Sequence, residues 1–173
     1  MKILIAEDEP DLLVQYQTIL EDHNHLVLTA DNGKRCLEIF RKELDNLPLT
    51  TDESEPQTPF DIVILDYQMP KMNGLEAAKE ILLLAPKQRI IFASAYVQET
   101  LVDSIKNLKQ IVELLQKPFG LQALVDTVED KQIYEELEKL NVDIRNLREL
   151  NPTHAQIRDY LDALQKLQKG RTF

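Results

Sequence analysis

The chain has little of what several large classes of protein require. Its 173 residues include a single cysteine, Cys36, which excludes an internal disulfide framework. Every apolar run is far shorter than the roughly 20 residues that cross a bilayer, and no signal peptide precedes the first predicted strand. We therefore expect a cytoplasmic protein with no membrane insertion.

The chain also lacks an excess of basic residues. Its formal net charge is −10. Residues 1–128 hold 12 basic and 21 acidic side chains, and residues 129–173 hold 8 basic and 9 acidic ones. A DNA-binding module normally carries a clear surplus of lysine and arginine. Nucleic acid is therefore not an expected partner.

Apolar patterns predict alternating strands and helices. The length leaves room for one core of ordinary size plus an appendage. Short runs of aliphatic residues predict strands at about 2–6, 26–29, 61–65, 89–93 and 111–115. Helical patterns occur at about 10–22, 33–45, 74–85, 98–108 and from 119 onward. Such alternation predicts an α/β fold, a doubly wound parallel sheet with helices on both faces.

Polar residues stand where four of the predicted strands end. One aspartate after a strand is most often a turn or cap residue, so each case alone is ordinary. Four such positions in one chain are hard to explain by chance, and open α/β sheets place their chemistry at this edge. The residues are Glu7 and Asp8, Asp66, Ser94, and Lys117.

The first 128 residues resemble the receiver domain of two-component response regulators. The matching segments are Glu7-Asp8, Asp66 in the pattern Asp-x-x-Met-Pro-x-Met-Asn-Gly, Ser94-Ala95 and Lys117-Pro118-Phe119. The resemblance implies a five-stranded flavodoxin-like sheet of order 2-1-3-4-5. It covers a receiver domain at 1–128, and the helical extension at 129–173 resembles no family that we recognise.

The resemblance implies a magnesium site. In the implied strand order, Glu7, Asp8 and Asp66 converge on one crevice, where three ionised carboxylates would repel one another. Mg²⁺ binds to oxygen ligands of this kind. By resemblance, Asp8 and Asp66 bind Mg²⁺ directly, Glu7 binds it through water, and Gln68 contributes its backbone carbonyl.

The resemblance also implies that Asp66 is a phosphoacceptor. Ser94 would donate a hydrogen bond to one phosphoryl oxygen, and Lys117 would pair with another. The phosphoryl group would come from a sensor histidine kinase or a phosphotransfer protein. The Lys117-Pro118 bond is usually cis in the family.

Two segments depart from the usual receiver pattern. An aromatic residue normally stands three positions before the lysine and reports the activated state, whereas this chain has Leu114 there. The stretch 44–60 is rich in proline, threonine and acidic residues, which predicts a solvated loop longer than receivers need. We assign the loop no function.

Beyond the receiver, apolar residues recur at helical spacing. A first seam comprises Ile133, Leu137, Leu140, Ile144 and Leu147, and a second comprises Ile157, Leu161, Leu164 and Leu167. The dipeptide Asn151-Pro152 predicts the end of one helix and the start of another. Because neither helix can hide its apolar stripe alone, we expect a helical hairpin or coiled coil and a homodimer.

Several functions remain open at this point. A phosphatase of the haloacid dehalogenase type needs a second aspartate two positions after the nucleophile, where this chain has Gln68, so no enzyme acting on an external substrate is expected. We favour a response regulator that is phosphorylated on Asp66 and switches contacts with a downstream protein. The alternatives are a transcriptional regulator with an atypical helical output and a scaffold that works without phosphorylation.

Overall fold

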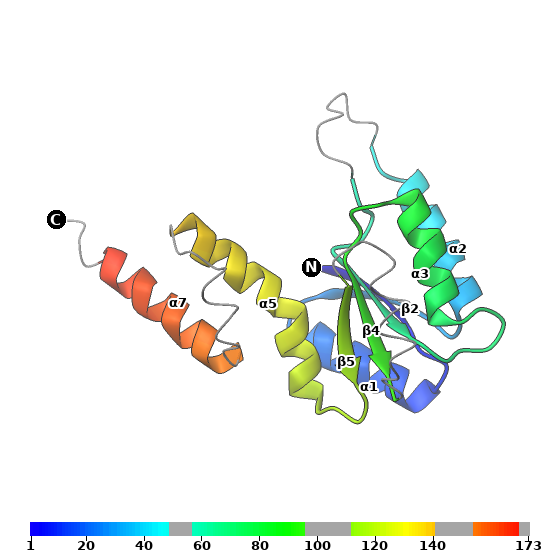
Figure 1. Cartoon of the computed structure of the whole chain (residues 1–173), viewed down its shortest axis with the longest axis horizontal. Coiled ribbons are helices and arrows are strands. Elements are labelled where there is room, and N and C mark those ends of the chain that lie inside the picture. The colour runs from blue at the N-terminus through cyan, green and yellow to red at the C-terminus, as the bar shows by residue number, and fades with distance from the viewer. Residues whose placement is uncertain (49–56, 96–111, 141–153, 170–173) are drawn as a thin grey trace. The chain divides into compact units, whose positions relative to one another are not determined.

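The structure is a computed structural model that describes residues 1–48, 57–95, 112–140 and 154–169 (Figure 1). The chain divides into two compact units, Met1–Leu121 and Gln122–Phe173. Within the described ranges, no helix combines the length and the apolar character that crossing a membrane requires.

The first unit is built on a parallel sheet whose strand order is β2-β1-β3-β4-β5. Both the α/β class and this strand order confirm the prediction. The predicted strand bounds are correct to within one residue, and Asp66 and Ser94 prove to be the last residues of their strands rather than the residues after them. The strands are β1 (Lys2–Ala6), β2 (Leu26–Ala30), β3 (Ile62–Asp66), β4 (Ile90–Ser94) and β5 (Val112–Gln116).

Three described helices of this unit cover the sheet. Helices α2 (Gly33–Asp45) and α3 (Gly74–Leu84) lie side by side on one face, and α1 (Pro10–Asp22) lies on the other (Figure 1). The helix predicted at 98–108 lies outside the described residues.

Local sequence signals fix where α2 and α3 begin. The Asn32 side chain accepts a hydrogen bond from the Arg35 backbone N–H at 2.9 Å and caps α2. Asn73 and Glu76 form a capping box at the start of α3, with distances of 2.9 and 3.0 Å. Since α3 starts shortly after β3, this cap also fixes the turn that leaves the end of β3.

The core fills both faces of the sheet. β3 and β4 are buried along their whole lengths, as expected for central strands of a parallel sheet. The aromatic rings of Phe40 and Phe60 pack at 6.0 Å between centroids. The prediction of an unburied loop at 44–60 is therefore wrong at its ends, because Phe60 is buried and Asp45 belongs to α2.

The second unit contains α5 (Leu121–Lys139) and α7 (His154–Lys169). Leu137, Ile157 and Leu161 form a buried cluster between them, against which Leu140 and Leu164 are partly buried. Packing of the two apolar seams against each other, one of the arrangements expected from the sequence, is present. Ile144, Leu147 and Asn151-Pro152 lie outside the described residues.

Two details of this unit differ from the sequence prediction. α5 ends at Lys139 instead of continuing to Asn151. The two helices also run in the same direction. Arg158 donates to Glu129 at 2.7 Å, and Gln165 donates to Glu136 at 3.0 Å, so a step of seven residues along one helix matches a step of seven along the other. A direct antiparallel hairpin through a turn at Asn151-Pro152 is therefore not what the described helices form.

Gly74 allows the turn after β3 to pack closely against the strand. Its backbone N–H donates to the Tyr67 carbonyl at 3.0 Å, and a Cβ atom added at Gly74 would overlap the carbonyl oxygen of Asp66. Overpacking against backbone costs about 1–3 kcal/mol. We expect Gly74→Ala to lower the free energy of unfolding by about this amount in urea denaturation.

The matched control for this substitution is Gly120→Ala, because a Cβ added at Gly120 has nothing within 4 Å. We expect this variant to change stability by less than about 1 kcal/mol. Equal urea midpoints for the two variants would contradict the close packing of Gly74 on Asp66.

Candidate functional site

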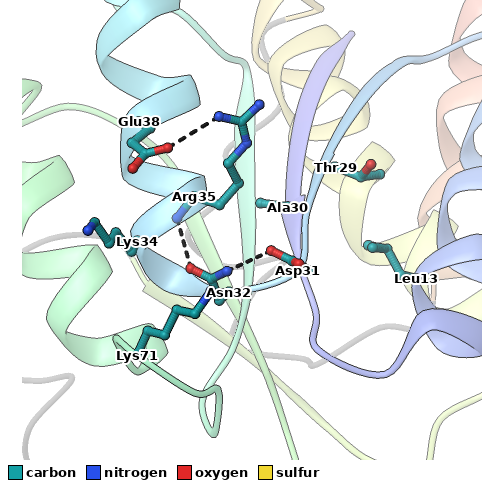
Figure 2. A pocket seen from close by; sticks show the side chains of 9 residues that line it. All are labelled: Leu13, Thr29, Ala30, Asp31, Asn32, Lys34, Arg35, Glu38 and Lys71. Carbon is teal, nitrogen blue, oxygen red and sulfur yellow. Dashed lines mark hydrogen bonds and ion pairs between the residues drawn. The ribbon is translucent and has the colours of Figure 1, made fainter.

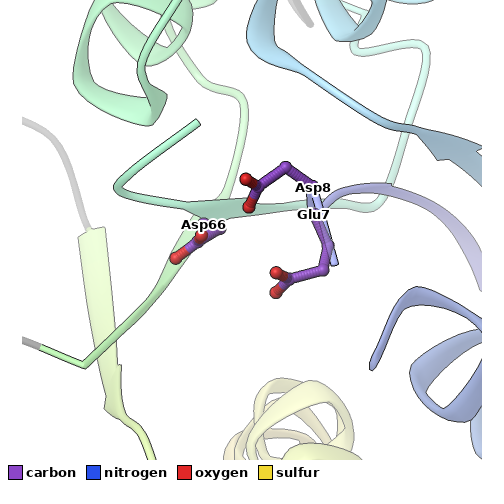
Figure 3. Close-up of side chains that lie close together, drawn as sticks. All are labelled: Glu7, Asp8 and Asp66. Carbon is purple, nitrogen blue, oxygen red and sulfur yellow. The ribbon is translucent and has the colours of Figure 1, made fainter. Parts of the chain in front are cut away.

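Three carboxylates meet at the carboxyl edge of the sheet. Glu7 and Asp8 follow β1 directly, and Asp66 ends β3, which pairs with β1 so that Ala6 lies opposite Leu65. Their ligand oxygens all lie within 4.8 Å of one another (Figure 3). Glu7 and Asp66 are buried, whereas Asp8 is exposed. Parallel pairing of the two strands therefore brings together acids that are far apart in the sequence.

Lys117 supplies a positive charge to this acidic cluster. Its Nζ lies 2.6 Å from Oε2 of Glu7 and 3.3 Å from Oδ1 of Asp66. Its backbone N–H donates to the Ser94 carbonyl at 2.8 Å, which fixes the base of the side chain. Burial lowers the pKa of Lys117, but the hydrogen bond to Glu7 and the charges of Asp66 and Glu7 outweigh burial and raise it. The ammonium group therefore stays charged.

One ammonium group does not balance the cluster. Burial, and then the negative charge of Glu7, raise the pKa of Asp66 from 3.8 to about 6, although Lys117 acts in the opposite direction. An unfavourable charge on a buried carboxylate can be relieved by a proton or by a cation. Carboxylate oxygens are hard ligands, so the residues present fit a hard divalent cation such as Mg²⁺.

The other predicted site residues occupy different surroundings. Ser94 ends β4 and is buried, one position beyond Ala93, the partner of Asp66 across the sheet. Gln68 lies exposed in the turn between β3 and α3. Leu114, in place of the usual aromatic residue, is half-buried and packs against the main core.

Sequence reasoning missed Tyr16, which lies on the buried face of α1. Its side chain is only 4% exposed, and its ring stacks on that of Phe119 at 5.4 Å between centroids. Burial raises the pKa of Tyr16 to about 12, while Lys117 acts to lower it and Glu7 acts to raise it. The sequence offered one signal, the spacing of four residues between Tyr16 and Leu20, which places both on the same face of a helix.

A cavity lined by described residues is separate from the acidic cluster. It measures about 600 Å³ and lies between the end of β2 and the start of α2 (Figure 2). Within it, Arg35 pairs with Glu38 at 3.2 Å, and the Asn32 side chain donates to Asp31. None of the three clustered carboxylates lines this cavity, so we place the candidate chemistry at the acidic cluster and not in the cavity.

The raised pKa of Asp66 predicts a pH-dependent gain in stability for Asp66→Asn. The carboxylate destabilises the fold when charged, so its penalty is complete above about pH 6 and disappears as the pH falls toward 4. In metal-free buffer at pH 7.5, we expect the variant to be more stable by about 1–3 kcal/mol. The difference should vanish near pH 4.

Denaturation midpoints at several pH values measure this effect. Asp162→Asn, at an exposed position on α7, is the matched control. A stability difference between Asp66→Asn and the wild type that stays constant from pH 4 to 7.5 would contradict the assigned electrostatic strain.

Known sequences match the part of the chain that contains the acidic cluster. Residues 3–129 match the family described as response regulator receiver domain. The chain is 33% identical over 131 residues to the chemotaxis protein CheY of Listeria monocytogenes, covering 75% of this chain and 96% of that protein. It is 25% identical over 127 residues to the sporulation initiation phosphotransferase F of Bacillus subtilis, covering 73% and 90% of the two chains.

Solved structures share the fold. The N-terminal domain of an uncharacterized protein from Wolinella succinogenes superposes with a TM-score of 0.63 at 27% identity, covering 80% of this chain and 98% of that one. The CheX-CheY-BeF3-Mg complex from Borrelia burgdorferi gives a TM-score of 0.62 at 23% identity, covering 75% and 87%, and at this identity it shows the fold alone. With a family match over residues 3–129, the chain belongs to the response regulator receiver domain family.

Proposed function

We propose that the chain is a response regulator that accepts a phosphoryl group on Asp66 and switches protein–protein contacts. The donor would be a sensor histidine kinase or a phosphotransfer protein. The observation that carries this proposal is the gathering of Glu7, Asp8 and Asp66 around the Lys117 ammonium group. The receiver family match supports the same chemistry.

Asp8, Asp66 and the backbone carbonyl of Gln68 would hold Mg²⁺, with Glu7 acting through a water molecule. When bound, the ion supplies positive charge that offsets the phosphoryl oxygens and the carboxylates. The fit rests on the three clustered carboxylates and on the incomplete compensation of their charge by Lys117.

Asp66 would act as the nucleophile. A carboxylate oxygen attacks the phosphorus atom of the donor, the new O–P bond forms, and the bond between phosphorus and the donor's leaving group breaks. Only the ionised carboxylate is nucleophilic, so chemistry requires the charged form that burial disfavours. Lys117, already 3.3 Å from Asp66, is placed to pair with a phosphoryl oxygen, and Ser94 is proposed to donate a hydrogen bond to another.

The added phosphoryl group would be the switching signal. It brings roughly two negative charges and three strong acceptor oxygens to the edge of the sheet. A backbone hydrogen bond joins Lys117 to Ser94, so we propose that a displacement of one residue would displace the other. We propose that residues 129–173 carry the output to a downstream protein partner.

We further propose that the extension makes the protein a homodimer. Leu137, Ile157 and Leu161 are buried between α5 and α7, but Leu140 and Leu164 are only half-buried at the margin of this cluster. Two helices cover one side of each other, whereas four helices from two chains enclose a complete core.

The phosphoacceptor assignment predicts modification at a single residue. We expect Mg²⁺ and a small acyl phosphate to add the mass of one phosphoryl group to the wild type. Asp66→Asn should gain none, because an amide cannot form the acyl phosphate. Intact-mass spectrometry makes the comparison, and Asp162→Asn, an exposed acid on α7, is the matched control that should be modified like the wild type.

Equal modification of the wild type and Asp66→Asn would refute the assignment of Asp66. An unmodified wild type under these conditions would favour a scaffold that works without phosphorylation.

The dimer proposal predicts that charge at the margin of the helical cluster separates the protomers. We expect the wild type to sediment as a dimer at micromolar concentration, and Leu140→Glu with Leu164→Glu to sediment as a monomer that still accepts phosphoryl. Leu83→Glu, at a position on α3 that is 77% exposed, is the control and should remain dimeric. Circular dichroism checks that helix content is retained. A monomeric wild type, with or without phosphoryl, would show the dimer proposal to be wrong.

A further inference from the structure

Two aromatic residues outside the acidic cluster are packed against each other beside it. Tyr16 on α1 and Phe119 stack with 5.4 Å between ring centroids and 22° between ring planes. Phe119 stands two residues after Lys117 and two residues before α5 begins at Leu121. We call Tyr16 and Phe119 the aromatic pair.

The aromatic pair holds one end of the segment that carries Lys117. The other end is held by the backbone hydrogen bond from Lys117 to Ser94 at 2.8 Å. Between and beyond these two points the segment has little support, since Pro118 is exposed and an added Cβ at Gly120 would meet nothing within 4 Å. The stacking of Phe119 on Tyr16 is therefore a side-chain contact that restrains the segment after Lys117.

The aromatic pair bears on the chemistry because it stands next to the residue whose ammonium group contacts the acidic cluster. Its flexible side chain reaches 2.6 Å from Glu7 and 3.3 Å from Asp66 at the same time. Small displacements of a charged group from its reacting partners reduce rates strongly. Resting on the proposed phosphorylation of Asp66, we propose that Tyr16 and Phe119 are positioning residues, whose stacked rings hold Lys117 against Glu7 and Asp66.

The ring of Tyr16, and not its hydroxyl group, performs this role. Within the described residues, no hydrogen bond is found for the Tyr16 hydroxyl, whereas its ring has a defined partner in Phe119. Tyr16→Phe should therefore keep the function, because it keeps the stack. Tyr16→Leu and Phe119→Leu remove the stack but leave an apolar side chain of similar bulk.

Loss of the positioning of Lys117 can be distinguished from damage to the fold by its effect on Mg²⁺ affinity. The Lys117 ammonium group pairs with Glu7 and Asp66, and Mg²⁺ would be held by the same carboxylate cluster, so the two cations would compete for its negative charge. Loosening Lys117 should slow phosphorylation, which needs the ammonium group, and at the same time tighten Mg²⁺ binding. A variant that damages the fold would weaken both.

The experiment measures two quantities on the full chain. The rate of Asp66 phosphorylation by a small acyl phosphate is expected to fall roughly tenfold in Tyr16→Leu and in Phe119→Leu. The affinity for Mg²⁺ alone, measured by calorimetry, is expected to rise roughly threefold in the same variants. Tyr16→Phe should lie within about twofold of the wild type in both measurements, as should the matched control Tyr160→Leu on α7, where the tyrosine is 43% exposed.

A double-mutant cycle with Lys117→Ala then asks whether the aromatic pair acts through Lys117. With Lys117 absent, Tyr16→Leu should change neither the phosphorylation rate nor the Mg²⁺ affinity further, because the positioned group is gone. Additive effects, or a fall in both quantities in Tyr16→Leu, would overturn the proposal in favour of a purely structural role. Unchanged rate and affinity in Tyr16→Leu would overturn it as well.

The two proposals fail in different ways. If the wild type accepts no phosphoryl group, the proposed function is wrong, yet the Mg²⁺ affinities of the same variants still decide whether the aromatic pair holds Lys117. If the wild type is phosphorylated and the cycle is additive, only the positioning role is lost.

Discussion

The arrangement of the candidate site depends on the parallel pairing of β1 with β3. With Ala6 opposite Leu65, the residues that leave β1 and the last residue of β3 must share one edge of the sheet. The polypeptide thereby holds Glu7, Asp8 and Asp66 within 4.8 Å, against their mutual repulsion. The buried apolar residues of β3 and β4 stabilise the sheet and so sustain this unfavourable grouping of charge.

Lys117 relieves this repulsion only in part, and the incomplete relief is chemically useful. If the negative charge of the carboxylates were fully neutralised, the cluster would attract a cation only weakly. If none of that charge were compensated, the repulsion between the carboxylates would destabilise the fold. Asp66, with a pKa of about 6, lies between these extremes. Its ionised form is thus available near neutral pH, while the protein carries a stability penalty at the position proposed for the reaction.

Much of the receiver could be predicted from sequence because its signals are local. Apolar runs indicated the strands, and the polar residues ending them indicated Glu7, Asp8, Asp66, Ser94 and Lys117. Tertiary contacts left no such signal. The burial of Phe60 depends on packing against Phe40, and the stacking of Tyr16 joins residues more than a hundred positions apart. The parallel course of α5 and α7 was missed because apolar periodicity indicates which face of a helix is buried but not the direction of its neighbour.

The hydrogen bond from the Lys117 backbone N–H to the Ser94 carbonyl ties together the ends of β4 and β5. Because main-chain atoms form this bond, a side-chain replacement at either residue leaves its donor and acceptor in place, apart from proline at position 117, which lacks the N–H. The bond therefore links the backbones of the two positions independently of the side chains they carry. A chain with Leu114 in place of the usual aromatic residue thus still contains a continuous covalent and hydrogen-bonded path from the edge of the sheet to the first turn of α5.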